Sequence, residues 1–142
     1  MENFINGMWT KPRSEQYADV FNPCTGEVIE TFACSNIEDV NEALQVANQA
    51  FKYWKKTPVA QRAVLQHKAA TLMRQNAERL ANSLASELGR PLAGCFTEIS
   101  RSTDLLDFYA EEGLRMKGEI PLHNLEGEKA LIVREAIGVV VA

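Results

Sequence analysis

Hydrophobic and polar positions divide the chain into a strand-like start, a helical middle and a strand-like end. Asn6-Gly7 lies between two short apolar segments and favours the type I′ turn of a tight hairpin, which is expected over residues 4–9. Residues 17–21 and 28–32 alternate in strand fashion on either side of the turn-forming residues 22–26. The start of the chain is therefore expected to form short antiparallel strands.

Apolar residues then recur at helical spacing in four consecutive segments, separated by helix start and stop signals. Ser35 and Glu38 have the spacing of a capping box. Thr57-Pro58 combines an N-cap hydroxyl with a proline at the first helical position. Asn76 is expected to cap the third helix and Gly89 to end it.

The fourth helix is expected over residues 91–118, and each helix carries one apolar stripe that is expected to face inward. In chain order, the stripes consist of Val40, Ala43, Leu44, Ala47, Phe51 and Trp54; Leu65, Ala69, Leu72 and Met73; Ala77, Leu80, Ala81, Leu84 and Leu88; and Ile99, Leu106, Ala110 and Leu114.

The end of the chain changes from helical to strand-like spacing. Residues 130–134 are expected to form a strand, and residues 138–142 are continuously apolar, as in a strand buried on both faces of a parallel sheet. A single buried strand without a parallel neighbour or a covering helix leaves a sheet unfinished. We therefore expect these 142 residues to be part of a larger fold.

Composition and charge narrow the class of protein. The length is that of one ordinary domain. A net charge of -4 argues against a nucleic-acid partner, because phosphate binding needs a basic excess. No apolar run approaches the roughly 20 residues that span a bilayer, and the first residues lack the basic and apolar regions of a signal peptide. A cytoplasmic protein without membrane contact is expected.

Few side chains have the spacing of a reactive site. Cys24, Cys34 and Cys95 lack the spacing of metal ligands and are expected to be buried or half-buried thiols with packing roles. His67 is expected to be a solvated helix residue and His123 a loop residue, since neither has acids or cysteines nearby in sequence. No glycine-rich nucleotide-binding motif is present. No catalytic, cofactor-binding or metal-binding residue is therefore predicted.

Arg101, in the expected fourth helix, is the one candidate binding residue. Arginine can hold a phosphate or a carboxylate through two parallel hydrogen bonds. The alternative is an ordinary surface ion pair with Asp104, three residues further on. The neighbouring Glu111 and Glu112 diverge on a helix and are expected to be solvated.

Several motifs, in order, cover nearly the whole chain. They are Phe4-Ile5-Asn6-Gly7-x-Trp9, Asn22-Pro23-Cys24-Thr25-Gly26-Glu27-Val28-Ile29, Ala50-Phe51-x-x-Trp54 followed by Pro58 and Arg62, Glu87-Leu88-Gly89-Arg90-Pro91-Leu92 followed by Glu98, and Arg134-Glu135-Ala136-Ile137-Gly138-Val139-Val140. Together they resemble the N-terminal segment of the aldehyde dehydrogenase superfamily. Cys24 stands where the pattern usually has alanine. Ala136 stands where it usually has proline, a difference that affects only the local turn geometry. The stretch at residues 109–119 is most similar to the branch with non-phosphorylating glyceraldehyde-3-phosphate and lactaldehyde dehydrogenases.

The resemblance implies an α/β fold: N-terminal antiparallel strands, four consecutive helices and two strands of an incomplete Rossmann-type fold. It implies that residues 1–118 belong to the cofactor-binding domain, residues 119–137 to oligomerisation strands and residues 138–142 to a sheet strand. It also implies that Arg101 faces the substrate channel and holds an anionic group. The catalytic cysteine, the glutamate base, the oxyanion-hole asparagine and the NAD or NADP site would follow these residues.

The expected function is therefore that of a fragment of an NAD(P)-dependent aldehyde dehydrogenase that oxidises a small, anionic aldehyde. By itself the chain is expected to be inactive and to bind no cofactor. Its partners would be the remainder of its own polypeptide and, in the whole enzyme, further copies in a homo-oligomer. Two alternatives stay open: a stand-alone helical binding module that pairs with a full-length subunit, and an inert product of an incomplete gene.

Overall fold

A computed structural model describes residues 1–122 and 127–141, so His123 and Ala142 lie outside the described residues. The chain begins with an antiparallel hairpin of β1 (Asn3–Ile5) and β2 (Met8–Thr10). Asn6 and Gly7 both have positive φ, 53° and 78°, as a type I′ turn requires. The expected hairpin and its turn are confirmed.

A second antiparallel hairpin joins β3 (Tyr17–Phe21) to β4 (Val28–Ala33). Its turn forms where the sequence indicates, because the Asn22 side chain accepts hydrogen bonds from the backbone N–H groups of Cys24 and Thr25, at 2.9 and 3.3 Å. The register shifts between Val20 and Phe21, where a bulge bends the ribbon.

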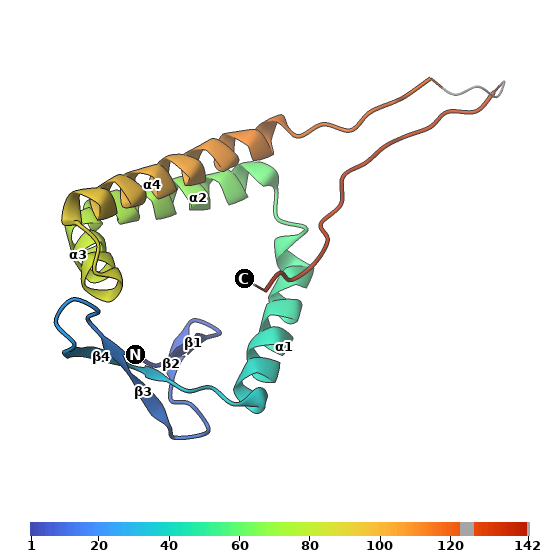
Figure 1. Ribbon diagram of the computed structural model, residues 1–142. Helices are drawn as coiled ribbons and strands as arrows, with labels where there is room; N and C mark the ends of the chain where they lie inside the picture. The colour runs from blue at the N-terminus through green and yellow to red at the C-terminus, as the bar shows by residue number, and fades with distance from the viewer. Residues whose placement is uncertain (123–126, 142) are drawn as a thin grey trace.

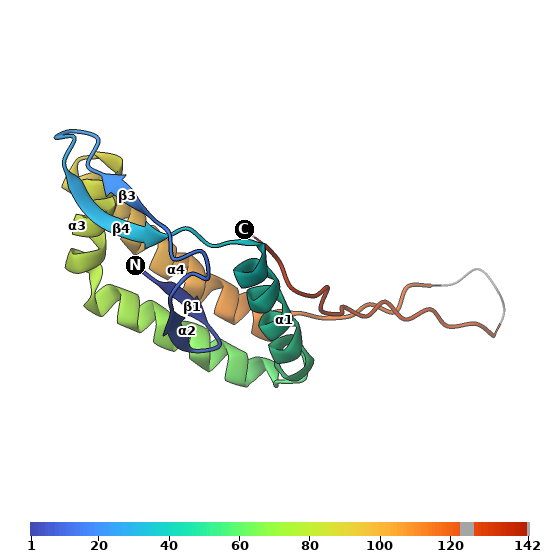
Figure 2. The same ribbon diagram turned by 90° about the horizontal axis from the view of Figure 1, so that it is seen from below.

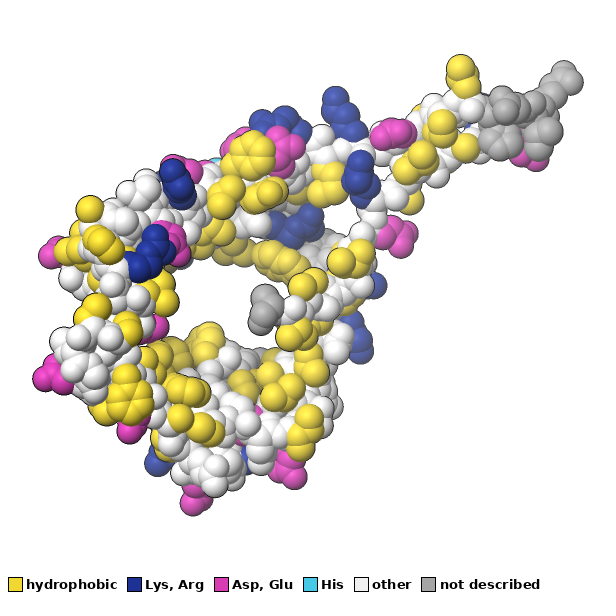
Figure 3. Space-filling view, viewed as in Figure 1, with side chains coloured by type: hydrophobic (Ala, Val, Ile, Leu, Met, Phe, Trp, Pro, Cys, Tyr) yellow, Lys and Arg dark blue, Asp and Glu magenta, His cyan; other side chains and the backbone are white. Residues whose placement is uncertain are grey.

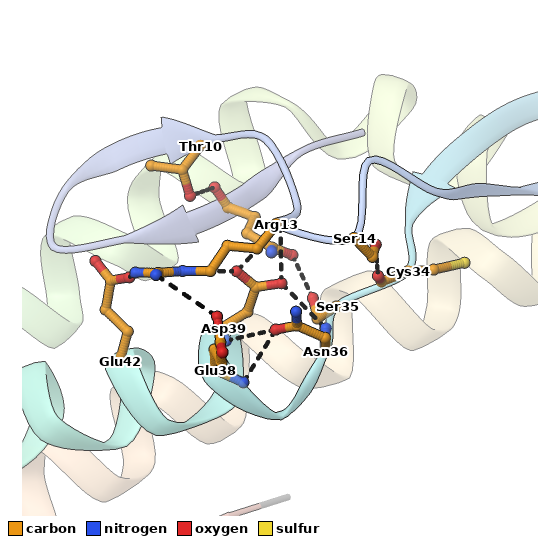
Figure 4. Close-up of polar contacts among 10 residues, drawn as sticks. Thr10, Arg13, Ser14, Cys34, Ser35, Asn36, Glu38, Asp39 and Glu42 are labelled. Carbon is orange, nitrogen blue, oxygen red and sulfur yellow. Dashed lines mark hydrogen bonds and ion pairs between the residues drawn. The ribbon is translucent and has the colours of Figure 1, made fainter.

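Helix α1 (Ile37–Trp54) has its N-cap at Asn36, one residue after the expected cap at Ser35. The capping box is formed by Asn36 and Asp39: the Asn36 side chain accepts from the Asp39 N–H at 3.1 Å, and Asp39 accepts from the Asn36 N–H at 3.0 Å. The expected pair of Ser35 and Glu38 is wrong, because the Ser35 hydroxyl instead donates to Asn3 of the first hairpin. Asp39 is only 4% exposed and also accepts from the backbone N–H of Arg13, which fastens the loop after β2 to α1 (Figure 4).

Three helices follow: α2 (Val59–Gln75), α3 (Ala77–Leu88) and α4 (Leu92–Arg115). The expected Thr57 cap is wrong, because its hydroxyl donates to the Tyr53 carbonyl and α2 begins after Pro58 without a side-chain cap. Asn76 occupies the N-cap position of α3 as expected, but its side chain makes no capping hydrogen bond there, since its amide donates back to the Leu72 carbonyl of α2. Gly89 does end α3, with a left-handed φ of 63°.

The helices pack through small residues. Helices α2 and α4 lie antiparallel along their length, and α3 packs against the first half of α4 (Figures 1 and 2). The buried residues at these contacts are Ala63, Ala70, Ala81, Cys95, Thr103 and Ala110. Among the described residues the largest fully buried side chains are Thr103, Pro12 and Cys95, so no large apolar side chain is fully enclosed.

The buried face of α2 differs from the expected one. Leu65 and Leu72 are 51% and 50% exposed and Ala69 is exposed, whereas Ala63 and Ala70 face α4. The prediction that this stripe faces inward is therefore wrong for three of its four residues, because the buried residues of α2 are small ones on a neighbouring stripe. Ala81 and Ala110 are buried as expected.

The elements form an open ring. Helix α1, the α2–α4 pair, α3 and the two hairpins surround an opening whose rim is rich in hydrophobic side chains (Figures 1 and 3). Large apolar side chains stay exposed on every helix, among them Val40, Trp54, Leu65, Leu72, Leu88 and Leu114. None of the described helices is long and apolar enough to cross a membrane.

After α4 the chain extends away from the ring and returns to α1 (Figure 2). The expected strand over residues 130–134 is not formed; Glu119 and Ile132 make one isolated antiparallel bridge, with N···O distances of 3.0 and 2.8 Å. The expected strand at residues 138–142 is also absent over the described residues 138–141. A strand needs a neighbour to satisfy its backbone groups, and the described part of the chain supplies none there.

Candidate functional site

Helix α4 carries the candidate residue Arg101 on the side opposite to its packed face. The packed face contains Cys95, Thr103 and Ala110. Arg101, Leu105 and Phe108 recur at spacings of four and three and therefore share one face. Leu105 and Phe108 are 54% and 52% exposed, and Arg101 is exposed too. This face combines one cation with two uncovered apolar side chains.

The Arg101 guanidinium has no ion pair within residues 1–122 and 127–141. Asp104, its alternative partner, instead contacts Arg74 of α2 at 3.3 Å. Glu98, one turn before Arg101, pairs with Arg90. Both acidic neighbours are thus engaged elsewhere, which leaves the Arg101 guanidinium free for an anion.

A cluster on the α2–α4 edge was not predicted. The two ring nitrogens of His67 contact carboxylates of α4: Nδ1 lies 2.6 Å from Asp107 Oδ1, and Nε2 lies 3.0 Å from Glu111 Oε1. Arg74 bridges Asp104 and Asp107. Glu111 is exposed and His67 partly exposed, as expected for solvated helix residues, but the ion-pair partner that each of them has was not predicted from the sequence.

A sequence signal for this cluster existed only in part. Asp107 and Glu111 are spaced to share one face of α4, and His67 and Arg74 are two turns apart on α2. The contact also requires that these two faces meet. This depends on how the helices are rotated relative to each other, and the spacing of residues along one helix does not specify that rotation.

His67 and Asp107 shift each other's pKa values. The hydrogen bond with Asp107 raises the pKa of His67, against an opposing effect of desolvation, and the contact with Glu111 raises it further. Hydrogen bonds from His67 and Arg74 lower the pKa of Asp107. Each shift favours the charged form of its group: the imidazolium of His67 and the carboxylate of Asp107.

None of the three free cysteines has an activating base beside it among the described residues. Cys95 is buried and Cys34 half-buried, as expected, but Cys24 is exposed. Its Sγ lies 3.7 Å from the Gly89 carbonyl oxygen at the end of α3. Over the described ranges, no histidine or carboxylate contacts a cysteine sulfur. No group of three histidine, cysteine or acidic side chains there could hold a metal ion.

The described residues also do not fit a dinucleotide. Their only sheets are two antiparallel hairpins, without the parallel strand edge and glycine-rich strand-to-helix turn that hold a pyrophosphate.

Comparison with known proteins shows which family this chain is similar to. The model of the aldehyde dehydrogenase family matches residues 9–142. The chain is 40% identical over 119 residues to malonate-semialdehyde dehydrogenase 2 of Oceanobacillus iheyensis, covering 84% of this chain and 24% of the relative. It is 33% identical over 141 residues to a 4-(hydroxymethyl)benzenesulfonate dehydrogenase of Comamonas testosteroni, covering 99% and 30%. An NADP-dependent glyceraldehyde-3-phosphate dehydrogenase of Arabidopsis thaliana is 36% identical over 116 residues, covering 82% and 23%.

Solved structures of aldehyde dehydrogenases also superpose on this chain. Succinate-semialdehyde dehydrogenase from Burkholderia pseudomallei superposes with a TM-score of 0.91 at 29% identity, covering 95% of this chain and 28% of that one. The 3,6-anhydro-L-galactose dehydrogenase in complex with NAP gives 0.83 at 27% identity, covering 90% and 27%. The chain thus spans between 23% and 30% of the length of these relatives. With nearly all of its residues matched by the family model, the chain belongs to the aldehyde dehydrogenase family.

Proposed function

We propose that these 142 residues work as the N-terminal segment of an NAD(P)-dependent aldehyde dehydrogenase that oxidises a small, anionic aldehyde to its acid. The observation that carries the proposal is the continuous family match over residues 9–142 in a chain that covers only 24% of a relative 40% identical to it. The exposed apolar stripes around the ring support it, because uncovered apolar surface of this extent calls for a covering partner.

The choice of an anionic aldehyde rests on two independent observations. The names of three relatives refer to malonate semialdehyde, a benzenesulfonate and glyceraldehyde-3-phosphate, which carry a carboxylate, a sulfonate and a phosphate. In this chain, Arg101 is exposed beside Leu105 and Phe108 and lacks an acidic partner among the described residues. A guanidinium next to apolar side chains suits a small substrate that has one anionic end.

In the whole enzyme, residues 1–118 would form the strand and helical part of the cofactor-binding domain. Residues 119–137 would become oligomerisation strands in a homo-oligomer, and residues 138–142 would begin a sheet strand. The catalytic residues and the NAD(P) site would lie in the remainder of the polypeptide, and the enzyme would be cytoplasmic. The isolated chain would be inactive.

A chimera tests the proposal. The 119 matched residues of the Oceanobacillus iheyensis enzyme are replaced by the corresponding part of this chain. NAD(P)H absorbance is then followed with malonate semialdehyde for the chimera and for the isolated 142 residues. The chimera is expected to be active and the isolated chain inactive. Aldehyde-dependent NAD(P)H formation by the isolated chain, or a folded but inactive chimera, would contradict the proposal.

Arg101→Gln in the active chimera tests the role of the guanidinium. Loss of a charged hydrogen-bonding partner costs about 1.5–3 kcal/mol, so kcat/KM for malonate semialdehyde should fall roughly ten- to a hundredfold, mainly through KM. Propionaldehyde, which has no anionic group, should be affected little. Arg79→Gln is the matched control, because Arg79 is an exposed arginine on α3. An equal loss with both aldehydes would remove Arg101 from substrate binding.

A further inference from the structure

One edge of the α2–α4 pair consists of alternating charges. Helix α2 contributes His67 and Arg74, and α4 contributes Asp104, Asp107 and Glu111. The contacts run in sequence along the antiparallel pair, from Glu111 and His67 at one end to Arg74 and Asp104 at the other. Asp107 lies between the two cations and accepts from both.

The geometry of His67 indicates its protonation state. Each ring nitrogen lies within hydrogen-bond distance of a carboxylate oxygen, at 2.6 and 3.0 Å. A neutral imidazole has one N–H and could donate to only one of these acceptors, leaving a lone pair facing the other carboxylate. Only the imidazolium, with two N–H groups, satisfies both contacts.

The rest of the α2–α4 interface buries little apolar surface, so the charged edge contributes a large share of the attraction between the two helices. The buried side chains of the two helices are Ala63, Ala70, Cys95, Thr103 and Ala110, which are small and have little apolar area to bury. The larger apolar residues of α2, Leu65 and Leu72, stay half exposed. The attraction between the helices therefore depends on polar contacts more than in a pair joined by leucine side chains.

We propose that His67 is a pH-sensitive latch: the protonated ring joins α2 to α4 through both Asp107 and Glu111, whereas the neutral ring keeps only the Asp107 contact, which weakens this edge. Deprotonation leaves Asp104, Asp107 and Glu111 facing a single cation, Arg74. The contact with Glu111 is then lost, because Asp107 holds the one remaining N–H at the shorter distance. No charged side chain of α3, the other helix packed on this pair, contacts the ring in the part of the chain that the structure describes.

The pH window follows from the two shifted groups. The pKa of His67 is raised on folding, so its contribution to stability is fully present below the ordinary value of about 6.5 and is lost as the pH rises through the raised value. The pKa of Asp107 is lowered, so its contribution is present above its ordinary value and is lost as the pH falls through the lowered one. The latch is strongest in mildly acidic solution and weakens towards alkaline pH.

Histidine NMR on the 142-residue chain tests the latch without any reference to dehydrogenase activity. The ring signals of His67 and His123 are followed between about pH 5 and 9 and assigned with His67→Gln. His67 is expected to titrate above about 6.5. Glu111→Gln should move its titration back towards that value, since the one ion pair of Glu111 among the described residues is with His67. Glu112→Gln is the matched control, because the adjacent Glu112 pairs with Arg115 and should leave the titration unchanged.

Thermal unfolding supplies a second readout. The unfolding midpoint of the wild-type chain should fall between pH 6 and 9, and His67→Gln should lose most of that dependence. A His67 that titrates at or below the ordinary value, or that responds equally to Glu111→Gln and Glu112→Gln, overturns the latch. The same is true of an unchanged pH dependence in His67→Gln. Each of these outcomes is separate from a failure of the proposed enzymatic function, which is measured as NAD(P)H formation.

Discussion

Gly89 combines two constraints at a single residue. Its φ of 63° lies in the left-handed region, which an L side chain adopts only at a cost. A Cβ atom at this position would also lie 2.8 Å from Cys24 Sγ and 2.9 Å from Pro23 Cγ. The residue therefore ends α3 and lets the turn between β3 and β4 approach the helix end.

Gly89→Ala should lower the free energy of unfolding by about 1–3 kcal/mol, through backbone strain and overpacking together. Gly94→Ala is the matched control within α4. Its Cβ would have no neighbour closer than 3.9 Å, so it should stabilise by about 0.5–1 kcal/mol. Urea unfolding of the two variants measures both effects. A neutral Gly89→Ala would show that the turn does not rest on the helix end.

At the scale of the element, α2 has two adjacent apolar stripes and packs on α4 through the smaller one. Ala70 is fully enclosed, whereas the adjacent Ala69 is exposed. Small residues let two helix axes approach closely, and the distance between axes depends on the side chains at the contact. The charged edge at His67 and Arg74 depends on this close approach.

Ala70→Leu should force the helices apart and cost about 1–3 kcal/mol of unfolding free energy. Ala69→Leu adds the same atoms on the exposed side and should change stability by less than about 0.5 kcal/mol. Chemical denaturation gives both values. The NMR titration of His67 adds a local readout, because separated helices should return its pKa towards the ordinary value. Equal costs for the two variants would mean that α4 does not cover Ala70.

At the scale of the whole molecule, the ring leaves large apolar side chains uncovered on every helix, with a hydrophobic rim around the opening (Figure 3). Soluble monomers rarely keep so much contiguous apolar surface exposed. In the proposed enzyme, the remainder of the polypeptide covers it.

The isolated chain should therefore bind the dye ANS with a several-fold rise in fluorescence and should self-associate as its concentration increases. The chimera should show neither behaviour, because the same surfaces are covered there. Size-exclusion chromatography and dye titration measure the difference. A monodisperse isolated chain that unfolds cooperatively and binds no dye would instead favour a stand-alone binding module.

The sequence by itself determined the local structure and the family. The turn at Asn6-Gly7, the Asn22 turn and the end of α3 at Gly89 were predictable, because turn geometry depends on a few adjacent residues. The four helices followed from apolar spacing within each segment. Start signals were less certain: Asn36 and Asp39 form the cap one residue after the expected pair, since both pairs have the same spacing.

The tertiary structure alone decided which faces meet. The sequence shows that α2 has apolar stripes, but only packing showed that α4 covers Ala63 and Ala70 and leaves Leu65 half exposed. The same rotation of the helices brings His67 between Asp107 and Glu111, residues 40 and 44 positions away. The expected strand at residues 130–134 did not form, because a strand depends on a neighbouring strand and only the isolated Glu119–Ile132 bridge is present there among the described residues. Contacts between distant residues depend on the relative placement of whole elements, and periodicity within one element does not specify it.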